Sequence, residues 1–328
     1  MLLLMLEGGA SLLGAWSQTN VRPPSRETKH SEYDAELGWV HLQNVSVPDL
    51  YGPDLHLTTN GQRLRGPRDY SLEKPEGKYR IICLGDSFTM GYGVGDKDTF
   101  PALLEQLEPR IETINMGMGG YGIDQCYLWY LREGVAFEAD LLLFSFIEGD
   151  FNRMLPKGNV ANRVKPLLEL VEDKPVAVNL PIPNILEPSL GRRWGNFWKK
   201  SSLFKLLPKP KRRPLAPPAE QPYAPVSLRI FEELRDLSLK RDQAFVLAYL
   251  PVESELRKTK SPLVDGWLRP ELEPRKVELL DLRESFRRLK RSERAEYFTQ
   301  AHFSRKGNML AAREFLARLR ELDPRFPR

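Results

Sequence analysis

Cysteine and histidine are scarce in this sequence, which limits the kinds of site it can build. The 328 residues include two cysteines and four histidines. Two cysteines make no disulfide framework, and Cys83 and Cys126 both lie in stretches where a buried small side chain is expected. The histidines are too widely spaced to form a zinc signature. We therefore expect no metal and no cofactor.

A long uninterrupted apolar run is also missing. The first 16 residues, MLLLMLEGGASLLGAW, are mostly apolar, but Glu7 interrupts them, and they have no basic flank and no convincing cleavage site. A helix that crosses a bilayer needs about 20 apolar residues. Residues 1–20 are therefore either an amphipathic cover for the domain or the end of an anchor that begins upstream. We expect the protein to be exported or held at a membrane, with a cytoplasmic location as the alternative.

Charge is unevenly distributed along the chain, whose net charge is +5. Residues 188–219 hold nine lysines or arginines and no acidic residue, and aromatic residues such as Trp194 and Trp198 lie among them. The stretch has no nucleic-acid-binding motif, so we expect no nucleic-acid partner. A solvated basic loop is one interpretation. Contact with an anionic membrane surface or an acidic polymer is the other, because mixed aromatic and basic side chains favour such surfaces.

The chain divides into an arm and a larger domain. Residues 21–78 are rich in turn formers, which predicts an N-terminal arm of short strands and loops. In residues 79–328, buried apolar strands alternate with amphipathic helices, which predicts a three-layer α/β/α domain. Five parallel strands are expected at residues 79–84, 111–115, 139–147, 245–250 and 277–282. Residues 151–224 break the pattern with a proline-rich, basic stretch, which we interpret as an insertion.

The segment RIICLGDSFTMGYGV, residues 80–94, places a serine where ligands bind in this class of fold. Its apolar run predicts a strand buried on both faces, and Gly85 marks the carboxyl end of that strand. Ligands of open α/β sheets bind at this end. Ser87, on a sharp strand-to-helix turn, would be exposed to the crevice like the serine of a nucleophile elbow. The alternative is a serine that only caps the helix or forms the turn.

Four blocks of the sequence together resemble the SGNH or GDSL hydrolase family. They are GDSFTMGYGV, INMGMGGYGIDQ after the second strand, EGDFN after the third, and HFSRKGN before the last helix. The resemblance covers residues 79–322 apart from the insertion. It implies a flavodoxin-like fold and an activity of the kind found in the family, whose members are esterases, lipases, carbohydrate deacetylases and acyltransferases.

The resemblance also implies roles for individual residues. Ser87 matches the nucleophile, and His302 matches the base. The main-chain N–H groups of Ser87 and Gly120 match the donors of the oxyanion hole. We interpret Asp86 and Asp150 as structural residues that accept main-chain hydrogen bonds and hold the turn around the serine.

Two positions depart from the family pattern, and each departure suggests substitutes. Gly149 stands where the family has an oxyanion-hole asparagine, and Asn152 could supply an amide instead. The family places an aspartate two or three residues before the histidine, where this chain has Thr299 and Gln300. The Gln300 carbonyl could orient His302, as asparagine does in papain-like sites. Glu296 is the other candidate for that role.

We therefore predict a serine-dependent hydrolase acting on ester bonds, with a small-molecule or carbohydrate ester as its substrate. An O-acyl esterase and an O-acyltransferase acting on a carbohydrate both fit, since the acyl-enzyme can pass its acyl group to water or to a sugar hydroxyl. The alternative is a catalytically weakened SGNH-fold protein that binds a glycan or an assembly partner.

Overall fold

The computed structural model describes residues 29–155, 164–184 and 217–326. Residues 1–20, for which we predict an anchor or an amphipathic cover, lie outside the described residues. So does nearly all of the basic stretch at 188–219, which we predict to meet an anionic membrane surface or an acidic polymer. Within the described part, no helix combines the length and the apolar composition that a membrane span requires.

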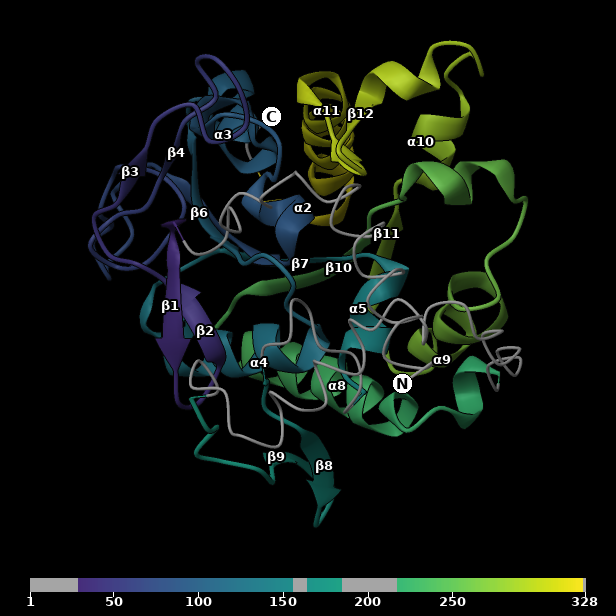
Figure 1. The fold of residues 1–328 in the computed structure, drawn as a ribbon. Coiled ribbons are helices and arrows are strands. Elements are labelled where there is room, and N and C mark those ends of the chain that lie inside the picture. Colours follow the sequence, from purple (N-terminus) through teal and green to yellow (C-terminus); the bar gives the residue numbers. More distant parts are fainter. Residues whose placement is uncertain (1–28, 156–163, 185–216, 327–328) are drawn as a thin grey trace, which may run out of the picture.

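The centre of the molecule is a five-stranded parallel sheet with the strand order β11-β10-β7-β5-β6 (Figure 1). Its strands are β5 (Tyr79–Gly85), β6 (Ile111–Gly117), β7 (Leu141–Phe146), β10 (Ala244–Tyr249) and β11 (Glu278–Asp281). Numbered along the chain, this order is 2-1-3-4-5, which is the flavodoxin-like arrangement. The predicted three-layer α/β/α fold with five parallel strands is thus confirmed.

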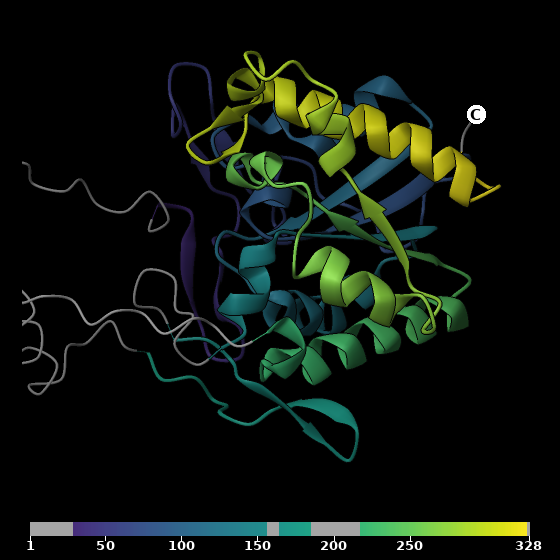
Figure 2. The same ribbon diagram turned by 90° about the vertical axis from the view of Figure 1, so that its right-hand side faces the viewer.

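Helices cover both faces of the sheet (Figure 2). On one face lie α4 (Ile123–Arg132) and α8 (Tyr223–Lys240), and on the other α3 (Phe100–Leu107) and α11 (Arg305–Leu322). A hydrophobic core lies on each face of the sheet. A strand contributes side chains to both cores, because successive side chains point to opposite faces. In β5, Ile82 and Leu84 belong to the core beneath α4 and α8, whereas Ile81 and Cys83 belong to the core beneath α3 and α11.

Side-chain caps set the starts of several helices. Thr99 accepts a hydrogen bond from Ala102 N at 3.3 Å and begins α3, and Ser304 accepts one from Gly307 N at 3.3 Å and begins α11. Shorter elements complete the domain: α2 (Ser87–Met90), α5 (Glu148–Arg153), α9 (Arg269–Leu272), α10 (Arg283–Arg287), β12 (Phe298–Thr299) and β13 (His302–Phe303).

The described part of the arm forms two antiparallel strand pairs, β1 (Ser31–Asp34) with β2 (Gly38–His41), and β3 (Ser46–Val47) with β4 (Leu57–Thr58). The first pair packs against the turn that follows β6. Trp39 Nε1 donates to Gly119 O at 3.0 Å, and the Tyr121 hydroxyl donates to Trp39 O at 2.5 Å. The arm therefore supports a loop at the carboxyl edge of the sheet.

Part of the predicted insertion is ordered secondary structure. The insertion was expected to start at residue 151, but helix α5 runs through this position. Phe151 is completely buried in the core. Further on, β8 (Leu168–Val171) and β9 (Lys174–Ala177) form a hairpin that projects from the domain (Figure 1).

Candidate active site

Ser87 lies at the point where the central strand β5 turns into helix α2. Asp86 caps this helix, since its side chain accepts a hydrogen bond from Phe88 N at 2.8 Å. Asp86 thus accepts a main-chain hydrogen bond, as predicted. Ser87 is thereby placed at the carboxyl end of a central strand, the position where ligands bind in open α/β sheets.

His302 reaches Ser87 from the other end of the chain. It lies on β13, and its Nε2 is 2.8 Å from the Ser87 Oγ. The rings of Phe88 and Tyr92 flank the imidazole, with ring centroids 4.8 Å and 4.7 Å from its own. Ser87 and His302 therefore lie within hydrogen-bond reach of each other, as predicted.

The other nitrogen of the imidazole is held by the main chain. His302 Nδ1 lies 2.8 Å from the carbonyl oxygen of Gln300. We predicted that the Gln300 carbonyl could orient His302, and the carbonyl that makes this contact is that of the main chain. The hairpin turn brings the backbone carbonyl, rather than the side chain, to Nδ1.

Glu296, the other predicted orienting residue, is engaged elsewhere. Its carboxylate pairs with Lys306 at 2.5 Å, and both side chains are more than half exposed. Its carbonyl oxygen accepts a hydrogen bond from the Ser304 hydroxyl at 2.6 Å. Six residues upstream of the histidine, the carboxylate of Glu296 thus points to the solvent-exposed side of the turn.

Two main-chain N–H groups remain the candidates for stabilising an oxyanion. Gly120 is the third residue of the turn from Met118 to Tyr121, which is closed by a hydrogen bond of 3.3 Å between Tyr121 N and Met118 O. Its φ of +81° suits glycine at this place in a type II turn. Among the described residues, no hydrogen bond uses the N–H of Ser87 or of Gly120. Their role as oxyanion donors stays a prediction.

The third predicted donor is less well placed. Asn152 is exposed in the last turn of α5, and no hydrogen bond in the described part of the chain holds its amide toward Ser87. Gly149, at the start of the same helix, has room for a side chain, because a Cβ there would meet only Ile147 side-chain atoms at 3.4 Å and 3.7 Å. The contribution of Asn152 stays a prediction.

Arg153 is a partly buried part of the site that sequence reasoning missed. Its Nη1 donates to Asp86 at 2.8 Å, to Tyr121 O at 3.0 Å and to Asp150. Asp150 also accepts a hydrogen bond from Ile147 N at 3.0 Å, the kind of main-chain contact predicted for it. The spacing of Asp150 and Arg153 in one helix was the available signal, because residues three apart lie on the same face.

The two carboxylates share one cation in a buried environment. Burial raises the pKa of Asp150 well above its ordinary value, and the negative charge of Asp86 adds to this effect, whereas Arg153 lowers it. The neighbouring carboxylates raise the pKa of Arg153 beyond its already high value, although burial opposes them. The cluster therefore keeps its guanidinium charged and ties α5 to the turn that carries Ser87.

The site therefore joins a serine and a histidine at the carboxyl edge of a flavodoxin-like sheet. Neither a protein-family model nor a curated protein matches the sequence. Solved structures are similar at low identity. A lipase/acylhydrolase from Enterococcus faecalis is 14% identical, with a TM-score of 0.42, over 76% of this chain and 97% of that chain.

Two further solved structures are similar to the same degree. An acetyl xylan esterase is 12% identical, with a TM-score of 0.44, over 73% of this chain and 99% of that one. The psychrotrophic esterase EstA from Pseudoalteromonas sp. is 12% identical, with a TM-score of 0.43, over 75% and 98%. These values are too low to transfer an activity, so the activity of this chain is inferred from its own residues.

Proposed function

We propose that the protein is an ester hydrolase of the SGNH type in which Ser87 is the nucleophile and His302 the general base. The observation that carries this proposal is the chain of two hydrogen-bond contacts, both 2.8 Å long, from Ser87 Oγ through the imidazole to Gln300 O. A nucleophile, a base within hydrogen-bond reach and a group that orients the base are the parts that acyl transfer requires.

The carbonyl of Gln300 decides which nitrogen of His302 can act as the base. A carbonyl oxygen only accepts hydrogen bonds, so Nδ1 must carry the hydrogen that lies between them. In the neutral imidazole, Nε2 is then the nitrogen with the free lone pair. It faces the Ser87 hydroxyl, which can donate its proton to it. The backbone thus selects the tautomer that a general base needs.

The reaction follows from this arrangement. Ser87 Oγ forms a bond to the ester carbonyl carbon while its proton passes to His302 Nε2, and the carbonyl electrons move to the oxygen. The N–H groups of Ser87 and Gly120 are our candidates for stabilising that oxyanion. When the bond to the leaving alcohol breaks, His302 returns the proton to it. Water or a sugar hydroxyl then gives a proton to His302 and attacks the acyl carbon. The bond between that carbon and Ser87 Oγ breaks, and His302 returns the proton to Ser87.

The substrate that we propose is an O-acyl ester of a small molecule or a carbohydrate. Water as the acceptor makes the protein an esterase, and a sugar hydroxyl makes it an acyltransferase. We expect slow turnover, because the group beside Nδ1 is a neutral carbonyl and stabilises the imidazolium less than a carboxylate would. In serine proteases, replacing the triad aspartate with a neutral asparagine lowers turnover by about 10⁴.

The test is hydrolysis of p-nitrophenyl acetate by the purified full chain. Ser87→Ala and His302→Gln should each reduce kcat at least about 10³-fold, and His56→Gln, which changes an exposed histidine of the arm, should not. Mass spectrometry after brief exposure to the ester should show an acetyl group on Ser87. Acetylated oligosaccharides, offered with and without a free sugar acceptor, would then distinguish hydrolysis from transfer.

The alternative is a catalytically weakened protein that binds a glycan or an assembly partner. Gly149 motivates it, because this position provides no side-chain donor to the oxyanion. If hydrolysis by the wild type and by Ser87→Ala is equal, the enzyme proposal fails. Glycan binding that survives the same substitution would then favour the binding protein.

A further inference from the structure

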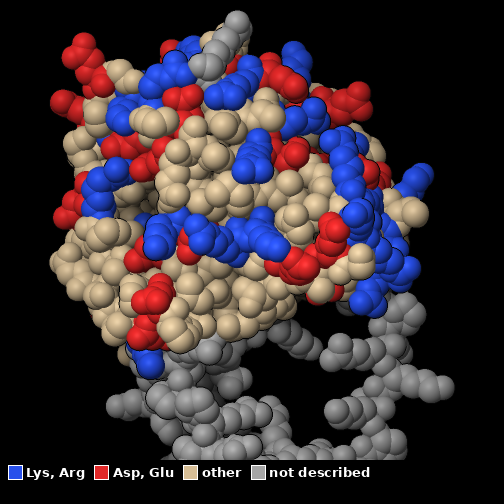
Figure 3. Space-filling model, turned by 90° about the horizontal axis from the view of Figure 1, so that it is seen from above, with Lys and Arg blue, Asp and Glu red and all other residues tan. Residues whose placement is uncertain are grey.

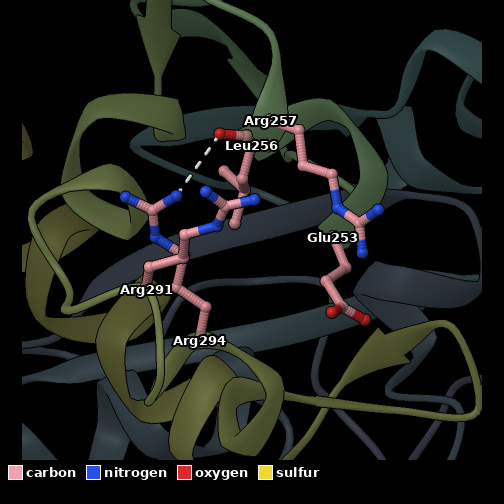
Figure 4. A pocket seen from close by; sticks show the side chains of 5 residues that line it. All are labelled: Glu253, Leu256, Arg257, Arg291 and Arg294. Carbon is pink, nitrogen blue, oxygen red and sulfur yellow. Dashed lines mark hydrogen bonds between the residues drawn. The ribbon is translucent and has the colours of Figure 1, made fainter.

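A cavity of about 240 Å³ lies beside the last strands of the domain, away from Ser87. Its lining residues are Glu253, Leu256, Arg257, Arg291 and Arg294. One wall is the short helical turn η5 (Glu253–Arg257), which follows β10. The other wall carries Arg291 and the turn η7 (Arg294–Tyr297), which leads into the β12–β13 hairpin (Figure 4). No residue of the Ser87–His302 site lines this cavity.

Main-chain carbonyl groups hold the Arg294 side chain in the wall of the cavity. Its Nε donates to Leu289 O at 3.2 Å, its Nη1 to Leu256 O at 3.4 Å and its Nη2 to Arg287 O at 2.6 Å. Three main-chain carbonyls therefore hold the guanidinium but bring no negative charge. Because a guanidinium has five N–H groups, one N–H on each terminal nitrogen remains available. The Arg294 guanidinium is thus held in place and can still donate hydrogen bonds to an anion.

Arg257 and Arg291 are exposed at the same cavity. In the part of the chain that the structure describes, neither guanidinium forms an ion pair with a carboxylate. Neighbouring cations differ in this respect: Arg287 pairs with Glu284 at 2.6 Å, and Lys290 approaches Glu293 to 3.5 Å. All three arginines that line the cavity therefore lack an acidic partner among the described residues.

The charges around the cavity do not balance. Glu253 is the only acidic residue among the five that line it, against three arginines. Figure 4 shows the guanidinium groups of Arg291 and Arg294 on one side and the side chains of Arg257 and Glu253 on the other. Lysine and arginine side chains also gather along the right-hand edge of the surface seen from above, the side on which α10 lies (Figure 3). An anion between the guanidinium groups would relieve their repulsion.

We propose that this cavity binds a phosphate group. Guanidinium forks match the oxygen atoms of phosphate, and such charge-assisted hydrogen bonds are stronger than neutral ones. The cavity volume corresponds to roughly eight water molecules, so it has room for a phosphate and part of the molecule that carries it. The phosphate group is the shared chemistry, whether it arrives as the free ion or as a phosphomonoester. This proposal does not depend on the ester-hydrolase activity.

The experiment compares two double variants that lose the same charge. Arg257→Gln with Arg291→Gln removes two of the three arginines that line the cavity. Arg313→Gln with Arg318→Gln removes two exposed arginines of α11 as the control. Binding of inorganic phosphate, and separately of glycerol 3-phosphate, is measured by calorimetry at constant ionic strength, with neutral glycerol as the blank. Circular dichroism and thermal unfolding show that each variant folds.

The expected result is phosphate binding by the wild type and by the α11 control, weakened at least about tenfold in the cavity variant. Equal affinity for both phosphate compounds would identify the free ion as sufficient, and tighter binding of glycerol 3-phosphate would identify a phosphomonoester as the ligand. The proposal is overturned if the wild type binds neither compound. It is also overturned if the cavity variant and the control bind phosphate equally well.

Discussion

The carbonyl oxygen of Gln300 lies 2.8 Å from Nδ1 of His302, two residues further along the chain. The contact is made inside the β12–β13 hairpin, where Thr299 pairs with His302. The two residues of its turn, Gln300 and Ala301, both have positive φ angles, +48° and +63°. This is the backbone of a type I′ turn, which most often contains asparagine and glycine. The orientation of the histidine therefore depends on a turn made of unfavourable residues.

Removing the Gln300 side chain should leave activity nearly intact. We expect Gln300→Ala to keep kcat on an activated ester within a factor of about two, because the orienting group belongs to the main chain. Ala301→Pro is the opposing variant. Proline requires φ near −65°, so it should break the turn and reduce kcat strongly. A large loss of kcat in Gln300→Ala would show that the side chain orients His302 after all.

Glycine at position 301 should stabilise the protein. The left-handed backbone costs an L-residue roughly 1–2 kcal/mol, part of which is offset by the entropy that glycine loses on folding. We expect Ala301→Gly to raise the free energy of unfolding in urea by about 0.5–1 kcal/mol. Ala295→Gly, in η7 and without a positive φ, should lower it by a similar amount. Equal effects at both positions would contradict this explanation.

An amide at position 149 should accelerate hydrolysis. The space around Gly149 accepts a Cβ at ordinary contact distances, so Gly149→Asn can add a donor near the oxyanion. If Asn152 already fills that role, Asn152→Ala should reduce kcat by roughly 10². Both rates are measured on one activated ester beside Ser87→Ala. If neither substitution changes kcat while Ser87→Ala abolishes it, the oxyanion is stabilised by the main chain alone.

Removing the shared cation should destabilise the fold. Arg153→Met leaves the carboxylates of Asp86 and Asp150 buried together, which should lower the free energy of unfolding by about 3–5 kcal/mol. Arg318→Met, at an exposed ion pair, should cost less than about 1 kcal/mol.

The deficit of Arg153→Met should depend on pH. The pKa of Asp150 is raised in the folded protein, so its protonated form is the one that folding favours. Stability from this group is present below the unfolded pKa and is lost as the pH rises through the folded pKa. Without Arg153 the deficit should therefore shrink as the pH falls. Urea unfolding at several pH values measures it, and a deficit that grows toward acid would contradict the shared-cation account.

His41 should make the protein sensitive to mild acid. The pKa of His41 is lowered to about 4, chiefly by burial and also by the positive charge of Arg65, although hydrogen bonds to Gly117 O and His30 oppose the shift. The unfolded value is about 6.5. Because the pKa of His41 is lower in the folded protein, its contribution to the free energy of unfolding is fully present above about pH 6.5. This contribution is lost as the pH falls toward 4, by up to about 3 kcal/mol.

Urea unfolding between pH 7 and pH 4 tests this contribution. The slope of the unfolding free energy against pH should be smaller in His41→Gln than in the wild type. His56→Gln, at an exposed position of the arm, should keep the wild-type slope. Comparing slopes separates the titration of His41 from any general loss of stability that the substitution causes. Identical slopes in His41→Gln and the wild type would rule out His41 as the titrating group.

The local pattern of the sequence was enough to predict the sheet and the two side chains, Ser87 and His302, that meet at its edge. Strands β5 and β6 begin at Tyr79 and Ile111 as expected, because buried parallel strands are continuous apolar runs that end at turn residues. The motifs around Ser87 and His302 mark the ends of elements that parallel topology brings to one edge. The strands and the placing of these two residues depend on neighbouring residues in the chain and on the way in which parallel strands are connected. They can therefore be predicted from the amino-acid sequence alone.

The tertiary structure decided which groups complete the site. The sequence suggested the side chains of Gln300 or Glu296 beside His302, but the backbone angles of the hairpin turn place a carbonyl there. Arg153 joins Asp150, three residues before it, to Asp86, which lies 67 residues before it in the chain. The cavity with Arg257 and Arg291 needs two turns that follow different strands. Each of these contacts depends on the direction of a turn or side chain in space, which residue order and spacing do not specify.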